Sequence, residues 1–131
     1  VLGEPQYRKY ALRRVRDAMR ETESFGYERA RERQFELGRR VRELLVSRGF
    51  PSVAAAGFEA PGVVVSYTTD PGIQSAKKFV ALGLQTAAGV PLQCDEPADF
   101  SSFRIGLFGL DKLADVERTV AALEDALKRM G

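Results

Sequence analysis

The apolar residues of this chain change their spacing near Pro51. Before it, apolar residues recur at steps of three and four, the period of an α-helix with one apolar face. After it, the chain turns to short β-branched runs separated by proline and glycine, which favours strands. A chain that joins these two periods is typical of an α+β domain, in which helices pack on one face of a sheet.

Two helices are expected before that change. The first carries Leu12, Val15 and Met19 at helical spacing, and a polar break at residues 22–26 separates it from the second. The second helix, residues 27–48, has the stronger apolar period and alternates arginines with glutamates on its outer side. This pattern predicts a long amphipathic helix with a charged, solvated face.

Strands and shorter helices are expected in the rest of the chain. Asp70 and Pro71 have the residue types of a helix N-cap and first helical position, and Ile73, Phe79 and Val80 are expected to face inward from that helix. Together these elements predict a two-layer α+β domain, with helices packed on a small, mostly antiparallel sheet. In order, we expect strands at 62–67, 84–88 and 103–108, helices at 71–83 and from 113 to the end, a loop at 90–100, and one further strand at 53–56.

Composition excludes several classes of function. The chain has 131 residues, a net charge of +2, one cysteine and no histidine. The single cysteine permits no internal disulfide and favours a cytoplasmic location, while the lack of histidine removes the commonest general base and metal ligand. No apolar run approaches the length of about 20 residues that a membrane helix needs. The small charge surplus, gathered in the first 48 residues, is too weak to predict nucleic-acid binding.

Arg104 is the most informative candidate for a binding residue. It is a lone arginine in an otherwise apolar strand, and burying a guanidinium costs several kcal/mol unless an anion pairs with it. Its planar fork suits a carboxylate, which it can hold by two hydrogen bonds. The alternatives are an outward-facing strand residue or a structural ion pair with Asp95, Glu96 or Asp99. The pattern alone leaves these interpretations open.

Other reactive residues have no setting for catalysis. Cys94 has no histidine or second cysteine to activate it, so an inert thiol, buried or half-exposed, is expected. A lysine that forms a Schiff base needs an apolar environment, and all five lysines lie in polar helical contexts. The acids of the 90–100 loop are expected to be solvated rather than to bind a metal. The lysines are Lys9, Lys77, Lys78, Lys112 and Lys128.

Four stretches of the chain resemble one known family. They are 60–67 (APGVVVSY), 70–73 (DPGI), 83–92 (GLQTAAGVPL) and 103–109 (FRIGLFG). Together they are similar to the carboxy-terminal small domain of class V, fold type I aminotransferases, the group of the alanine–glyoxylate and serine–pyruvate enzymes. The resemblance covers about residues 11–130, and its most specific element is the strand with Arg104 followed by glycine and a last helix.

The resemblance implies an aminotransferase that uses pyridoxal 5′-phosphate and moves an amino group between a small amino acid and a 2-oxo acid such as glyoxylate or pyruvate. It implies that Arg104 binds the substrate carboxylate, and that the cofactor lysine belongs to a large domain outside these 131 residues. We therefore expect residues 1–26 to be an N-terminal helical segment and 27–131 the small domain, part of a homo-oligomer and inactive alone. The alternative is a non-catalytic interaction module that uses the basic amphipathic helices.

Overall fold

The structure is a computed structural model that describes residues 3–131; Val1 and Leu2, the start of the expected N-terminal segment, lie outside the described residues. It contains helices and a small sheet in the order expected for an α+β domain. The elements are α1 (Glu4–Phe25), α2 (Tyr27–Ser47), β1 (Val63–Tyr67), α3 (Pro71–Gln74), α4 (Lys77–Ala81), β2 (Ala87–Ala88), β3 (Ser102–Gly106), α5 (Leu110–Ala114) and α6 (Val116–Met130).

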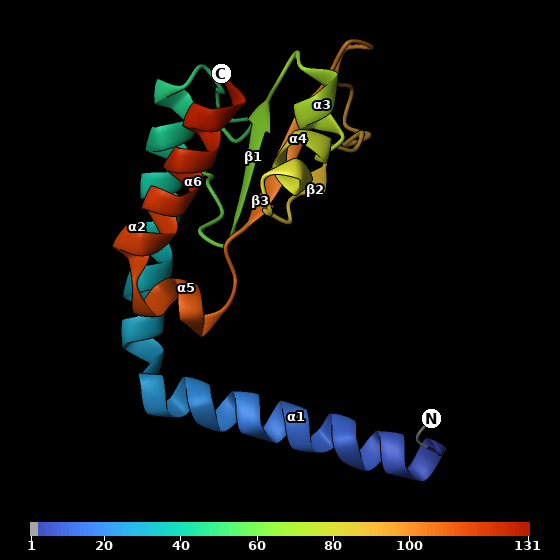
Figure 1. Ribbon diagram of the computed structural model, residues 1–131, viewed down its shortest axis with the longest axis vertical. Helices are drawn as coiled ribbons and strands as arrows, with labels where there is room; N and C mark the ends of the chain where they lie inside the picture. Colours follow the sequence, from blue (N-terminus) through green and yellow to red (C-terminus); the bar gives the residue numbers. More distant parts are fainter. Residues whose placement is uncertain (1–2) are drawn as a thin grey trace.

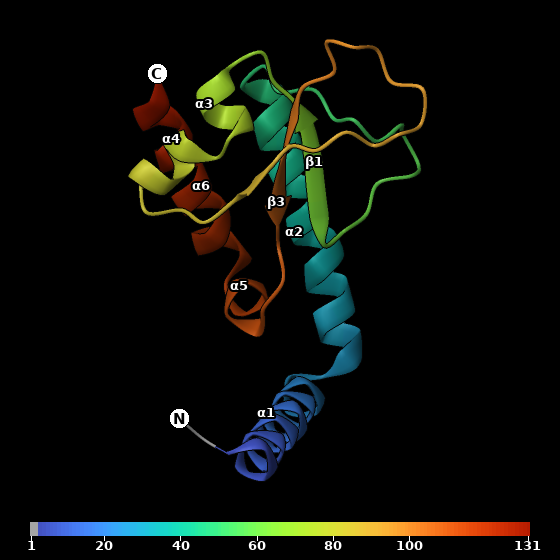
Figure 2. The same cartoon turned by 90° about the vertical axis from the view of Figure 1, so that its right-hand side faces the viewer.

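The three strands form one antiparallel sheet in the order β1–β3–β2, which confirms the predicted fold class. Helices α2 and α6 lie side by side behind this sheet, and α3 and α4 lie at its β2 side (Figures 1 and 2). The core between these layers includes Phe103 and Ile105 of β3, Phe79 of α4 and Leu45 of α2. Phe103 is fully buried, with its ring 5.4 Å from that of Phe50 and 5.6 Å from that of Phe79.

The opposite side of the sheet is not covered by a helix of the described chain. Figure 2 looks onto this side and shows β1 and β3 with no helix in front of them. Because side chains alternate along a strand, the residues between the buried ones point to this side. Val63 and Val65 of β1 and Arg104 of β3 are accordingly only partly buried. We call this side the open face of the sheet.

The helix expected at 71–83 is two short helices. Its start is as predicted, because the Asp70 carboxylate accepts hydrogen bonds from the backbone N–H of Gly72 at 2.7 Å and of Ile73 at 3.2 Å. The helix then breaks at Ala76, whose φ of 64° is left-handed and cannot continue an α-helix. The break turns α4, so Val80 is 63% exposed and the prediction that it faces inward is wrong.

Other expected elements are shorter or divided. The strand expected at 84–88 is limited to Ala87–Ala88, and the one expected at 53–56 is only a single bridge between Ser52 and Ser66. The last helix is divided into α5 and α6 at Asp115, whose carboxylate accepts a hydrogen bond from the backbone N–H of Arg118 at the start of α6. The break between the first two helices falls at Gly26, which has a φ of 98°.

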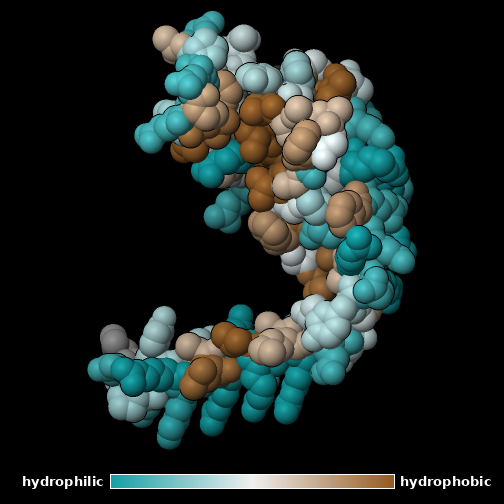
Figure 3. Space-filling model, turned by 180° about the vertical axis from the view of Figure 1, so that it is seen from behind, coloured by the Kyte–Doolittle hydropathy of each residue, from teal (hydrophilic) through white to brown (hydrophobic). Residues whose placement is uncertain are grey.

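Helix α1 forms as expected but packs on little of the described chain. It projects from the N-terminal end of α2 beneath the open face (Figure 1). The space-filling view shows a hollow between α1 and the rest of the domain (Figure 3). The apolar residues of α1 line the side that faces this hollow, and hydrophilic side chains cover the other side (Figure 3). None of its residues is buried, and Leu12 and Met19 are 69% and 63% exposed. Within residues 3–131, no helix is both long enough and apolar enough to cross a membrane.

Candidate functional site

Arg104 lies at the centre of the sheet and points to its open face. It pairs with Val65 on β1 and with Ala87 on β2, so a short apolar side chain flanks it on each side. Its neighbours along the strand, Phe103 and Ile105, are buried in the core. The alternation of β3 therefore places the one charged residue of the strand opposite the helices, where a ligand can approach it.

The guanidinium of Arg104 is oriented by a backbone oxygen. Its Nε donates a hydrogen bond to the carbonyl oxygen of Ala88 at 3.1 Å. Among residues 3–131, no carboxylate lies within ion-pair distance of it, so the predicted alternative of a structural pair with Asp95, Glu96 or Asp99 is wrong. The side chain is partly buried, and its two terminal nitrogens make no hydrogen bond to the described residues. The charge is therefore available to an anion from outside.

Glu96 is not available to Arg104 because it organises its own loop. Its carboxylate accepts hydrogen bonds from the backbone N–H groups of Leu92, Gln93 and Cys94. These bonds stabilise the charged form and lower the pKa of Glu96 from 4.5 to about 2. Glu96 therefore stabilises the 92–96 turn. Within the described residues, no group of His, Cys, Asp and Glu has the arrangement of a metal site.

The lysines of the described chain do not fit a cofactor imine. Lys78 pairs with Asp70, Lys128 with Glu124 at 3.0 Å, and Lys112 lies 3.7 Å from Asp111. All five lysines are exposed or only partly buried, so none has the apolar, desolvated setting that an imine-forming lysine needs. Pyridoxal phosphate therefore has no attachment point among these residues.

Cys94 is exposed, and the expectation of a buried or half-exposed thiol is wrong. It lies in the turn that Glu96 stabilises, where the backbone N–H of Cys94 donates to the carboxylate while the side chain stays at the surface.

The described chain also has a pocket of about 740 Å³ between the ends of α2, α6 and β1, and its lining includes Phe50, Tyr67 and Asp70. Arg104 is not part of that lining.

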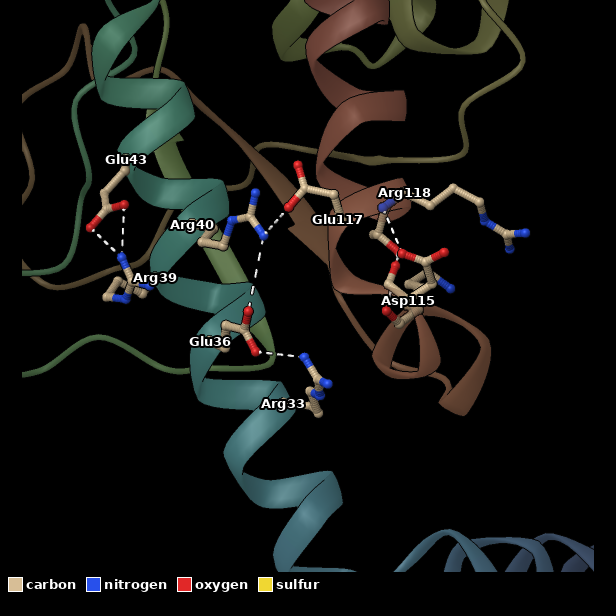
Figure 4. A network of polar contacts seen from close by, with 10 residues as sticks. Arg33, Glu36, Arg39, Arg40, Glu43, Asp115, Glu117 and Arg118 are labelled. Carbon is tan, nitrogen blue, oxygen red and sulfur yellow. Dashed lines mark hydrogen bonds and ion pairs between the residues drawn. The ribbon is translucent and has the colours of Figure 1, made fainter.

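Three of the six arginines of α2, namely Arg33, Arg39 and Arg40, form ion pairs with acids. Arg39 contacts Glu43 at 2.9 Å, and Arg40 joins α2 to α6 through Glu117 at 2.7 Å (Figure 4). The hydrogen bond to Glu117 raises the pKa of Arg40, and the same contact lowers the pKa of Glu117. Glu117 is well exposed, so we expect this pair to contribute little to stability.

Two glutamines that the sequence did not single out join distant parts of the chain. The side-chain amide of Gln34 donates to the carbonyl oxygens of Pro61 at 3.0 Å and Leu107 at 3.2 Å. The side-chain amide of Gln74 donates to the carbonyl oxygen of Gly89 at 3.2 Å. Their role depends on which backbone oxygens the fold brings near, and no local sequence pattern signals it.

Comparison with known proteins establishes the fold. No family model matches the chain, and no curated protein matches it. Among solved structures, the alanine–glyoxylate aminotransferase from Nostoc sp. is similar over 88% of this chain, with a TM-score of 0.69 and 18% sequence identity. The chain spans 29% of that protein's length. At this level of identity the likeness shows a shared fold, and this chain is similar to one part of the larger protein.

Proposed function

We propose that this chain is the carboxy-terminal small domain of a class V aminotransferase that depends on pyridoxal phosphate. Its reaction would move an amino group between a small amino acid, such as alanine or serine, and a 2-oxo acid, such as glyoxylate or pyruvate. Arg104 carries the proposal, because its guanidinium is oriented on the open face and has no carboxylate partner within residues 3–131. The fold shared with an alanine–glyoxylate aminotransferase supports it.

In this function Arg104 binds the substrate carboxylate and orients the substrate. A hydrogen bond to a charged group contributes about 1.5–3 kcal/mol, whereas a dissociation constant of 1 mM requires about 4.1 kcal/mol. Arg104 alone is therefore too weak to retain a substrate, and further contacts must come from another part of the enzyme. Its contribution is positioning rather than proton transfer.

The cofactor and the remaining contacts are proposed to belong to a large domain of the same enzyme. The described lysines do not fit the cofactor, so the bond-breaking chemistry is proposed to take place on groups of the large domain. The apolar side of α1 faces the hollow between this helix and the rest of the domain (Figure 3), and we propose that the large domain occupies it. A homo-oligomer in the cytoplasm, with the isolated chain inactive, completes the proposal.

The test is the variant Arg104→Ala in the enzyme that contains this chain. A loss of about 1.5–3 kcal/mol predicts a KM for the amino acid and the 2-oxo acid that rises roughly 10- to 100-fold. The absorbance of the bound cofactor should stay unchanged, because Arg104 is proposed to contact substrate alone. Arg118→Ala is the matched control, since Arg118 is exposed on α6 and makes no side-chain ion pair with the described residues. An unchanged KM in the Arg104 variant would remove this residue from the site.

A second candidate function is a non-catalytic interaction module. It is favoured by α1, which projects from the body and carries Lys9, Arg13 and Arg20 on its exposed surface without an ion pair to the described residues. Binding of phosphates by these side chains would weaken steeply with salt. Titration of the chain with duplex DNA at two salt concentrations tests this, and a lack of salt-sensitive binding would exclude the module as a nucleic-acid binder.

A further inference from the structure

The carbonyl group that orients Arg104 belongs to a very short strand. Strand β2 consists of Ala87 and Ala88 alone and pairs with β3 over these two residues. Strands of globular proteins usually have five or six residues, so a ladder of this length orders its backbone weakly. Another contact is needed to hold the Ala88 carbonyl in place for Arg104.

That contact comes from Gln74, the last residue of α3. Its side-chain amide donates to the carbonyl oxygen of Gly89 at 3.2 Å, and its own backbone carbonyl accepts a hydrogen bond from the N–H of Gly89 at 3.1 Å. Both backbone polar groups of Gly89 are therefore bonded to one residue. This arrangement anchors the residue directly after Ala88 to helix α3, whose start is capped by Asp70.

Gly89 permits this geometry because it has no side chain. A Cβ atom at this position would lie 1.7 Å from the carbonyl oxygen of Ser102, far inside any possible contact. Gly89, at the end of β2, thus lies in close contact with Ser102 at the start of β3 and is hydrogen-bonded to Gln74. Arg104 lies two residues along β3 from Ser102, so both ends of the bond from Arg104 to Ala88 are set by this contact.

We propose that Gln74 is a positioning residue for Arg104, acting through Gly89 and the carbonyl group of Ala88. The bond to Ala88 occupies Nε, which leaves the two terminal nitrogens of the guanidinium to form parallel hydrogen bonds to the oxygens of one carboxylate. Gln74 thereby favours an end-on binding geometry, in which both terminal nitrogens of Arg104 face the ligand. That a substrate carboxylate is the ligand rests on the proposed function; the orientation of Arg104 by Gln74 does not.

The experiment follows the Nε proton of Arg104 by NMR in the 131-residue chain, without any ligand. At mildly acidic pH guanidinium protons exchange slowly enough to be measured, and a proton engaged with Ala88 should exchange about tenfold more slowly than that of Arg118. Equal exchange at the two arginines in the unmodified chain would overturn the proposal before any variant is made.

The variant Gln74→Met keeps the length of the side chain and removes its donor. We expect the Nε proton of Arg104 to exchange about tenfold faster in this variant, whereas the backbone amide of Leu45, in the core, stays equally protected. Gln85→Met is the matched control, because Gln85 is exposed near β2 and its side chain makes no hydrogen bond to the described residues. Unchanged exchange at Arg104 in a folded Gln74→Met chain would refute the role of Gln74.

A second variant, Gln74→Glu, protects the test against a failure of the methionine variant to fold. The carboxylate cannot donate to the carbonyl oxygen of Gly89, so the same acceleration is expected at Arg104. These measurements are independent of substrate. Unchanged exchange at Arg104 in both Gln74 variants, together with a raised KM in the Arg104→Ala enzyme, would reject this inference alone. Faster exchange in the Gln74 variants, together with an unchanged KM in the Arg104→Ala enzyme, would reject only the proposed function.

Discussion

The substitution Gly38→Ala improves the helix propensity of α2 but worsens its packing. The structure shows which of these two effects on the free energy of unfolding is larger. Gly38 is buried in α2, where alanine would ordinarily stabilise the helix by about 1 kcal/mol. A Cβ atom at this position, however, would lie 2.6 Å from the carbonyl oxygen of Pro61 and 3.0 Å from its Cα. Both are backbone atoms, so the methyl group can be accommodated only if α2 and the turn before β1 move apart.

That movement also strains a hydrogen bond. The Pro61 oxygen accepts from the side-chain amide of Gln34, one turn before Gly38 on the same helix, at 3.0 Å. Overpacking costs about 1–3 kcal/mol and loss of the bond about 0.5–1.5 kcal/mol. Against the gain of about 1 kcal/mol from propensity, the net expectation is a loss of roughly 0.5–3.5 kcal/mol in the free energy of unfolding.

Urea unfolding followed by circular dichroism measures this change. We expect a lower midpoint with an unchanged slope, because the surface exposed on unfolding stays the same. Glu32→Ala is the control, since Glu32 lies on the exposed side of α2 without an ion pair to the described residues and reports helix propensity alone. A Gly38→Ala chain as stable as the Glu32→Ala chain would refute the proposed close contact between α2 and Pro61.

Three further predictions follow from burial and charge. Phe103→Ala should cost about 3–5 kcal/mol of unfolding free energy in the urea assay because Phe103 is fully buried, whereas Phe58→Ala, at an 84% exposed residue, should change it by less than about 0.5 kcal/mol. The pKa of Glu96 is lowered to about 2, so its stabilisation of the 92–96 turn is fully present above its ordinary pKa of 4.5 and is lost as the pH falls through about 2. This loss should appear as a pH-dependent change in the amide NMR shifts of the turn. The variant Glu96→Gln should abolish that change. Replacing Leu12 and Met19 together by serine should leave the urea midpoint unchanged and reduce any self-association seen by sedimentation velocity, since both are exposed on α1; a lower midpoint would show instead that α1 packs on the body.

Elements whose signals are local could be predicted from the sequence. The start of α3 follows from an aspartate before a proline, because the carboxylate accepts from backbone N–H groups within three residues of itself. The break at Ala76 has no such signal, since alanine rarely adopts a positive φ and tertiary packing must impose it. The same packing shortens the strand predicted at 84–88, because only Ala87 and Ala88 lie where β3 can pair with them.

The candidate site likewise combines a residue with a local sequence signal and features that depend on tertiary structure. Arg104 could be singled out because one charged residue in an apolar strand is visible in the sequence, and its chemistry then restricts the partner to an anion. Whether that anion was an acid of the same chain could not be decided, since the 90–100 loop could fold toward Arg104 or away from it. The structure shows that Glu96 is committed to its own turn. Gln74 could not be predicted, because the sequence does not show which distant carbonyl groups a glutamine reaches.

The position of Arg104 also explains why a site built on it needs a second surface. A ligand pocket buries most of its ligand, whereas Arg104 lies on the open face between Val65 and Ala87, with no helix of the described chain above it. Water can therefore reach the guanidinium and weaken any contact with a carboxylate, because charges interact far more strongly when solvent is excluded. A partner that fills the hollow beside α1 would remove that water and cover the apolar side of the helix in the same step. The orientation of Arg104 by Ala88 would then need no rearrangement, since it already exists without the partner.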